Sequence, residues 1–230
     1  MRDFFESFPS FLATSKTGAS AVRLNSRYRA IIESNSEVIR GRKILDIASH
    51  DGRWSFAALH AGCSHVRGVE ARPHLVQNAH TTFSALDVAK ERFDFVTGDV
   101  FEVMKRGTIK AETVLLLGFF YHTDRHSELA DLLAATGASH IILDTNIVPA
   151  AENLRKLPLI KLFQEPTGVE ANAIGPDAMA VVGHPSREAI DLINSRHGFS
   201  MSEFDWAPSR GPRELQDYNE DRRSTFVLSR

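Results

Sequence analysis

Short apolar runs alternate with amphipathic segments along the chain from about residue 40 onward. Strands buried on both faces of a parallel sheet have this short, continuous apolar pattern, and amphipathic helices connect them. The alternation therefore predicts βαβ units and a mostly parallel α/β sheet with helices on both faces. The expected strands are 43–48, 66–70, 93–97, 113–117 and 140–144, and the expected helices are 52–61, 72–83, 127–135 and 185–196.

Two more apolar stretches, 199–206 and 224–228, are expected to pair as a final hairpin at the end of the sheet, which brings it to seven strands. With 230 residues and 43% hydrophobic content, the chain is predicted to form a single domain. Its expected parts are a helical cap or lid (1–40), a ligand-binding core (41–148), and a lid loop, late helix and final strands (149–230).

The first 40 residues differ from the rest of the chain. Four phenylalanines with near-helical spacing predict an amphipathic helix that Pro9 interrupts or bends; they are Phe4, Phe5, Phe8 and Phe11. The main interpretation is a helix packed on the flank of the sheet, and the alternative is a lid with Asn25, Arg27 and Tyr28 as substrate contacts. Segment 153–177 is rich in Pro and Gly, and a connection this long is often a second lid.

Composition excludes several classes of function. A formal net charge of −2 gives no domain-wide basic field for nucleic acid. The single cysteine, Cys63, rules out an internal disulfide and a multi-cysteine zinc site. No apolar run is long enough to span a membrane, and the N-terminus lacks an export signal. These features predict a cytoplasmic protein without a membrane partner.

Acidic residues follow three successive strands. Asp46 ends the first strand and is followed by small and polar residues that lead into a helix, whose N-terminal amides suit an anionic ligand. Glu70 ends the second strand, where an acid can accept both hydroxyls of a ribose. Asp99 follows the third, beside Val100 and Phe101, where an acid can accept an exocyclic amine next to apolar surfaces. Because parallel strands end at a common edge, we expect these residues to meet at one crevice.

The order of the segments ILDIASHDG, VRGVEARP, FVTGDVFE and VLLLGFFYHTDRHSELADLL resembles the class I S-adenosylmethionine-dependent methyltransferases. The resemblance covers 41–148 well and the C-terminal half more loosely, where HPSREAIDLINSRHGFSMSEFDW resembles the late helix and sixth strand of the family. It implies a Rossmann-like doubly wound fold and S-adenosyl-L-methionine as the cofactor. The GFFYHTD segment is also similar to small-molecule methyltransferases and to tRNA wobble-uridine carboxymethyltransferases.

The resemblance implies a role for each matching position. Asp46 would lie near the amino group of the methionine moiety, Glu70 would hold the ribose hydroxyls, and Asp99 would meet the adenine amine. The remaining implied cofactor contacts are the loop residues Ala48, Ser49, His50 and Gly52, the adenine-stacking Val100, and the methionine-side residues Gly118 and Phe119. The family usually shows D-x-G-x-G-x-G, whereas here Ala48 and His50 stand at the first two glycine positions.

Methyl transfer from a sulfonium needs mainly alignment, and a general base when the acceptor is a hydroxyl. His122, next to Tyr121 at the expected mouth of the methyl channel, is the predicted catalytic base. Asp144 and Asn146 are candidate substrate contacts; holding magnesium against a diol is a second idea, which the lack of a clear third acid disfavours.

Two other groups of polar residues are expected to be ordinary surface residues. His126 is expected to face water in the first turn of a helix, and ordinary turn positions are expected for His140, His184 and His197. Arg210, Arg213, Arg222 and Arg223, interspersed with acids, are expected on a solvated face.

The preferred function is methylation of a small-molecule acceptor, at oxygen in the first instance and at nitrogen in the second. A tRNA-modifying alkyltransferase is an alternative, which the near-neutral charge counts against. A non-catalytic nucleoside-binding or scaffold protein of the same fold is another, consistent with the lost glycines. An NAD-dependent dehydrogenase ranks last because the chain has no G-x-G-x-x-G after the first strand.

Overall fold

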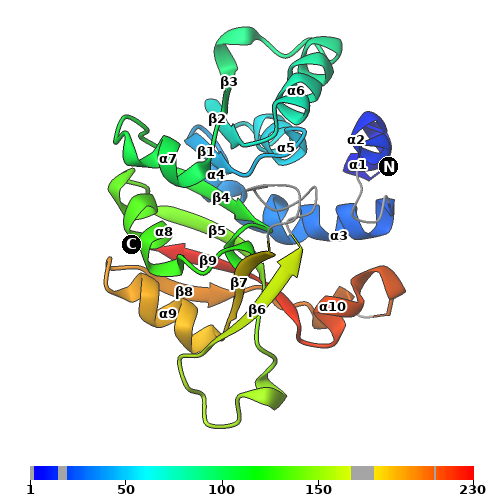
Figure 1. Cartoon of the computed structure of the whole chain (residues 1–230). Helices are drawn as coiled ribbons and strands as arrows, with labels where there is room; N and C mark the ends of the chain where they lie inside the picture. The colour runs from blue at the N-terminus through cyan, green and yellow to red at the C-terminus, as the bar shows by residue number, and fades with distance from the viewer. Residues whose placement is uncertain (1–2, 15–19, 167–178, 210) are drawn as a thin grey trace.

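The computed structural model describes residues 3–14, 20–166, 179–209 and 211–230. A seven-stranded sheet with the order β3-β2-β1-β4-β5-β9-β8 forms its centre (Figure 1). Its strands are β1 (Lys43–Ile47), β2 (His65–Glu70), β3 (Phe93–Thr97), β4 (Thr113–Leu117), β5 (His140–Asn146), β8 (Ser200–Glu203) and β9 (Arg223–Ser229). The first five are parallel to their neighbours, whereas β9 is antiparallel to β5 and β8. The predicted doubly wound, mostly parallel sheet is confirmed.

Helices lie on both faces of the sheet (Figure 1). The α-helices are α1 (Phe4–Ser7), α2 (Ser10–Ala13), α3 (Ala21–Ile31), α4 (Ser36–Ile39), α5 (Arg53–His60), α6 (Pro73–Ala85), α7 (Val100–Lys105), α8 (His126–Ala135), α9 (Arg187–Ser195) and α10 (Gln216–Asn219). Short 3₁₀ turns, η1 to η6, occupy Glu33–Asn35, Lys90–Arg92, Phe120–His122, Ala150–Glu152, Ala207–Ser209 and Arg213–Leu215. Among the described residues, no helix has the length and apolar character needed to cross a lipid bilayer.

Two apolar cores result from the alternation of side chains along the strands. In β4, Val114 and Leu116 point into one core, with helices α7, α8 and α9. Leu115 points into the other core, with helices α3 to α6 and the N-terminal phenylalanines. Because successive residues of a strand face opposite sides, the continuous TVLLL run is what a strand covered on both faces requires.

The N-terminal phenylalanines pack against α5 and α3 as a helical cap. Phe5 is fully buried and meets the Trp54 ring edge-on at 5.4 Å. Phe4 stacks on Tyr28 at 4.3 Å. Aromatic pairs at these distances add to the gain from burying apolar area. The cap therefore extends the core on the α5 side of the sheet.

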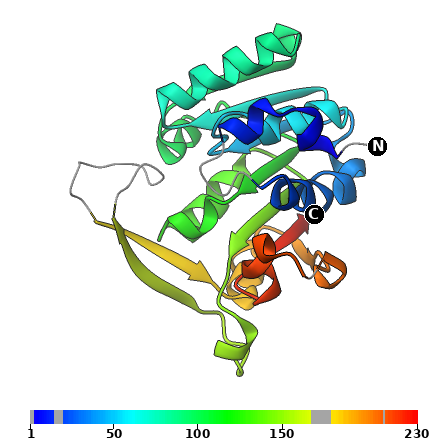
Figure 2. The same cartoon turned by 90° about the vertical axis from the view of Figure 1, so that its right-hand side faces the viewer.

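Two elements differ from the sequence-based expectations. Val100 begins a helix, α7, because Asp99 caps it by accepting a hydrogen bond from the Glu102 amide. Segment 153–177, expected as a lid without regular structure, contributes a strand, β6 (Ile160–Pro166), which pairs with β7 (Met179–Pro185) as an antiparallel hairpin; its role as a lid stays a prediction, and residues 167–177 lie outside the described residues. The hairpin extends away from the central sheet (Figure 2).

The loop after β1 has left-handed backbone at three alternate residues. Ala48, His50 and Gly52 have φ values of 54°, 55° and 77°. Left-handed backbone costs a non-glycine residue about 1–2 kcal/mol. Hydrogen bonds to β2 hold the loop in place, since the Ser49 amide donates to the Val69 carbonyl and the His50 amide to the Glu70 carboxylate. The loop therefore keeps a glycine-type backbone although two of its glycines are absent.

A substitution series at Ala48 tests this backbone strain. We expect Ala48→Gly to stay within about 1 kcal/mol of the wild-type free energy of unfolding, because relief of strain offsets the greater entropy of the unfolded chain. Ala48→Val should lose about 2 kcal/mol, because a β-branched residue fits left-handed backbone poorly. Urea denaturation measures both, with Ala180→Val in the extended strand β7 as the control. Equal midpoints for the two Ala48 variants would contradict the assignment.

Burial of Asp46 predicts a pH dependence of stability. Burial, and then the charge of Glu70, raise the pKa of Asp46 to about 7, against the opposing hydrogen bond from Ser55. The folded state therefore holds the proton more tightly, and stability should fall as pH rises from about 4 to 7. Asp46→Asn should abolish this loss, stabilising the ligand-free protein at pH 8 by on the order of 4 kcal/mol but not at pH 4. Urea denaturation across this range checks it, and the exposed Asp191→Asn, which retains Asp46, should lose stability with rising pH as the wild type does.

Candidate functional site

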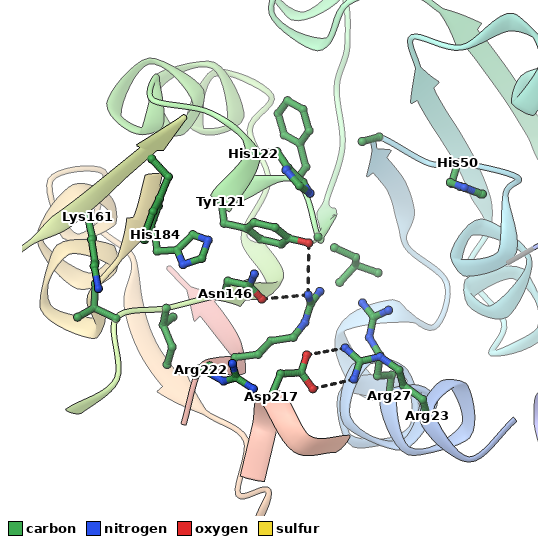
Figure 3. Close-up of a pocket in the computed structure, with 18 of the residues that line it drawn as sticks. Arg23, Arg27, His50, Tyr121, His122, Asn146, Lys161, His184, Asp217 and Arg222 are labelled. Atoms are coloured by element: carbon green, nitrogen blue, oxygen red, sulfur yellow. Dashed lines mark hydrogen bonds and ion pairs between the residues drawn. The ribbon is translucent and has the colours of Figure 1, made fainter. Parts of the chain in front are cut away.

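A cavity of about 600 Å³ opens at the carboxyl edge of the sheet, where β1 and β4 lie side by side (Figure 3). The chain order reverses between these two strands, and crevices at such points bind ligands in doubly wound sheets. The cavity wall is rich in cationic side chains, which are Arg23, Arg27, Arg53, Arg72, Lys161, Arg222 and Arg223, and it includes the acids Glu152 and Asp217.

The loop after β1 forms one wall. Ala48 and His50 line the cavity, whereas Asp46 and Ser49 are buried behind it. The Asp46 carboxylate accepts a hydrogen bond of 2.6 Å from the Ser55 hydroxyl on α5. The predicted loop residues thus lie together, and the buried Asp46 connects the end of β1 to α5 behind them.

Gly52, the last predicted residue of this loop, lies at the start of α5 rather than in the cavity wall. A Cβ atom at this position would lie 2.9 Å from the Phe95 ring, so close packing excludes any side chain. Together with its φ of 77°, this contact accounts for the glycine.

Glu70 lies at the tip of β2, directly beside the loop. Its carboxylate accepts hydrogen bonds from the His50 amide at 2.9 Å and from the Arg72 Nε at 2.7 Å. Burial opposes ionisation of Glu70, but the hydrogen bonds and charge of Arg72 outweigh it and hold its pKa below the ordinary value. Glu70 is therefore ionised, but it is only 2% exposed and does not line the cavity, so its contact with a ribose stays a prediction.

Asp99 and Val100 lie at the tip of β3 and are not in the cavity wall. Asp99 caps α7 through a 3.0 Å hydrogen bond from the Glu102 amide. The Val100 side chain is 2% exposed and belongs to the apolar core. Both residues therefore belong to α7, and their contact with adenine stays a prediction.

The segment after β4 forms the opposite lip of the cavity. Gly118, Phe119, Tyr121 and His122 all line it. The His122 Nδ1 lies 3.2 Å from a carboxylate oxygen of Glu165 on β6. A carboxylate that holds Nδ1–H leaves the basic lone pair of an imidazole on Nε2. The predicted base thus has a carboxylate beside its Nδ1, and its catalytic role stays a prediction.

Asp144 on β5 is fully buried and lies behind the cavity wall. It accepts hydrogen bonds from Arg27, Arg223, Tyr218 and Thr225. Burial disfavours its ionised form, but the charges of Arg223 and then Arg27 hold its pKa well below the ordinary range. Asp144 thus serves as counter-ion to two arginines. Among the described residues, no group of three or more His, Cys, Asp or Glu is placed to hold a metal ion.

Of the predicted substrate contacts, Arg27 and Asn146 line the cavity, whereas Asn25 and Tyr28 do not. The Asn25 carbonyl oxygen accepts a 2.9 Å hydrogen bond from the Phe5 amide and so fixes α1 to α3. Tyr28 packs against Phe4 on the far side of α3.

Sequence reasoning missed Arg223, which was placed on a solvated face. It is only 7% exposed, because it begins β9 opposite Asn146 of β5 and points into the cavity wall. The signal was its position directly before the predicted strand 224–228, which in the structure begins one residue earlier. Its neighbour Arg222 also lines the cavity but is paired with the exposed Glu220.

Two histidines also differ from expectation. His126, expected to face water, is 1% exposed, and its Nε2 lies 3.0 Å from the Gly183 carbonyl of β7, which joins α8 to the hairpin. His184, expected in an ordinary turn, lies on β7 and lines the cavity. Burial lowers the pKa of His184, so it is neutral at pH 7.

No protein-family model matches the sequence, and no curated protein matches it either. Comparison of the fold with solved structures gives clear likenesses at low identity. The N-terminal domain of EvdMO1, solved with SAH and D-fucose, is 16% identical, with a TM-score of 0.65, over 89% of this chain and 81% of that one.

In two further solved structures, the similarity covers nearly the whole length of the matched chain. An S-adenosylmethionine-dependent methyltransferase from Mesorhizobium loti is 12% identical, with a TM-score of 0.61, over 90% of this chain and 98% of that one. The DhpI–SAM–HEP complex is 14% identical, with a TM-score of 0.61, over 100% of this chain and 99% of that one. The chain therefore has the fold of the class I S-adenosylmethionine-dependent methyltransferases.

Proposed function

We propose that this protein transfers a methyl group from S-adenosyl-L-methionine to an oxygen atom of a small-molecule acceptor. The observation that carries the proposal is the cavity itself, which brings the left-handed loop at Ala48 and His50 to the Tyr121–His122 segment at the switch point of the sheet. The solved structures of EvdMO1 and DhpI, which share this fold, contain SAH and SAM.

The residues of the loop wall fit this cofactor. Ala48 offers only a methyl group to the cavity, and Gly118, with a φ of 82°, offers no side chain at all. Both let a ligand approach the backbone closely. Glu70 is ionised at the tip of β2 and would accept the ribose hydroxyls. Asp99 and Val100 are proposed as the adenine side, and Asp46 as the support of the loop near the methionine amino group.

Bound S-adenosylmethionine supplies a methyl group on a positively charged sulfur, which leaves as a neutral thioether. The protein then has to align the acceptor oxygen and remove its proton. His122 would do this, because Glu165 lies 3.2 Å from its Nδ1 and would leave the Nε2 lone pair to accept the hydroxyl proton. Loss of that proton would free the acceptor oxygen to take the methyl group. Tyr121 lies against His122, with ring centroids 4.1 Å apart, and restricts its position.

A small molecule is favoured over tRNA because the cations of the site line one cavity at the edge of the sheet. Most of them also pair with carboxylates, as Arg23 does with Asp217 and Arg53 does with Asp51. Recognition of a nucleic-acid backbone instead requires lysines and arginines spread over an accessible surface.

Calorimetry with S-adenosylhomocysteine tests cofactor binding. We expect saturable binding to the wild-type protein, and about tenfold weaker binding to Ala48→Val, because the added methyl groups enter the cavity wall and distort the loop. Ala48→Gly should bind as well as the wild type. Absence of binding heat at millimolar ligand would overturn the methyltransferase proposal in favour of a scaffold role.

Substitution of His122 tests the general base. With the best hydroxylated acceptor of a small-molecule panel, His122→Ala should slow S-adenosylhomocysteine formation by about 10²-fold, because the hydroxyl proton then has no acceptor. Affinity for S-adenosylhomocysteine should stay within twofold of wild type. The exposed His74→Ala is the control. Unchanged turnover in His122→Ala would show that this side chain is structural.

A further inference from the structure

Two buried arginines share one carboxylate at the wall of the cavity. The Arg27 Nη2 lies 3.0 Å and the Arg223 Nε 2.8 Å from the same oxygen of Asp144. Residues Arg27, Asp144 and Arg223, here the Asp144 cluster, are 9%, 0% and 7% exposed. The neighbouring Arg23 does not alter this balance, because it makes two hydrogen bonds, of 2.7 and 2.6 Å, to its own carboxylate, Asp217. The cluster therefore carries one positive charge in excess.

The cluster also has hydrogen-bonding capacity that the protein does not use. Among the described residues, the buried Nε of Arg27 has no hydrogen-bond partner. The Arg223 Nη1 donates to the Asn146 side-chain oxygen at 3.2 Å, the upper end of the ordinary range, and lies 3.5 Å from the Tyr121 hydroxyl. Buried donors without a good acceptor and buried charge without a counter-ion are both unfavourable, so such an arrangement is suited to an anionic ligand.

The position of the cluster separates it from the loop wall. Arg27 extends from α3 and Arg223 from the start of β9, and both line the cavity next to Tyr121 and Asn146. Figure 3 shows His50, on the loop proposed to hold the cofactor, across the cavity from Asn146. A group held at the cluster would thus face the cofactor from the acceptor side.

We propose that the Asp144 cluster binds a carboxylate or phosphate group of the methyl acceptor, an inference that rests on the proposed methyltransferase function. Arg27 and Arg223 supply the charge, and the guanidinium groups give paired N–H donors that match two oxygens of either anion. The Tyr121 hydroxyl and the Asn146 amide border the same space and help to orient the rest of the acceptor. The acceptor class is therefore a small hydroxylated acid or phosphate ester.

Anion titration of the protein saturated with S-adenosylhomocysteine tests this proposal. Inorganic phosphate and acetate should bind to the wild type by calorimetry, and acetamide, the uncharged analogue of acetate, should not. Arg27→Gln should weaken phosphate binding about tenfold, since a hydrogen bond to a charged group is lost. Arg27→Lys keeps the charge and should recover part of the affinity. Both variants should fold, because Asp144 keeps its hydrogen bond from Arg223. Circular dichroism checks this.

Arg222→Gln is the matched control. Arg222 lines the same cavity and its loss changes the net charge equally, but its guanidinium is paired with the exposed Glu220 at 2.6 Å. Phosphate affinity should stay within twofold of wild type in this variant. An equal loss in Arg222→Gln and Arg27→Gln would show a general field effect and overturn the specific site.

The Asp144 cluster could also bind the carboxylate of the cofactor in place of an anionic group of the acceptor. Binding of S-adenosylhomocysteine and of 5′-methylthioadenosine, which lacks the carboxylate, distinguishes the two. We expect Arg27→Gln to bind both within twofold of wild type. Weaker binding of S-adenosylhomocysteine alone, or failure of phosphate to bind beside it, would overturn the acceptor site. If the wild type binds neither nucleoside, the proposed function fails. Titration of the ligand-free protein with phosphate then shows whether the Asp144 cluster binds an anion.

Discussion

A single buried carboxylate, Asp144, connects parts of the chain that are far apart in sequence. It accepts hydrogen bonds from Arg27 on α3, Tyr218 on α10, and Arg223 and Thr225 on β9. Removing one partner of a buried ion pair typically costs about 3–5 kcal/mol, because the remaining charge has lost its compensation. The N-terminal cap, the middle of the sheet and the C-terminal strands therefore meet at one charged point, and that point borders the cavity. The stability of the fold and the shape of the site depend on the same contacts.

The two walls of the cavity differ in the chemical groups that they present. The loop after β1 offers backbone and small side chains, anchored to β2 through the Ser49 and His50 amides. The opposite wall offers guanidinium groups, held in place by carboxylates from β5 and α10. One wall thus suits close contact with a neutral or mixed ligand, and the other suits an anion. The His122–Glu165 pair lies where the two walls meet the β6–β7 hairpin.

The sheet could be predicted from sequence because its signals are local: β1 and β4 are continuous apolar runs, and the acid Glu70 ends β2. Other features depend on contacts between distant segments. Arg223 is buried only because β9 pairs with β5 in one particular register. The β6–β7 hairpin lacks the alternation of a half-buried strand, since nearly all of β6 is exposed, so its residues resemble a loop in sequence. Asp99 was expected only as a ligand contact, because the helix that it caps, α7, is short and no periodicity in the sequence indicated it.

The loop at Ala48 and His50 has a left-handed backbone conformation without the glycines that usually adopt it. Anchoring to a neighbouring strand can enforce the shape that glycine merely permits, at a modest cost in strain. A protein can therefore lack the glycines of such a loop and still keep the backbone conformation that forms the cavity. Proteins of this kind are to be recognised by comparing structures, because their sequences no longer contain the motif.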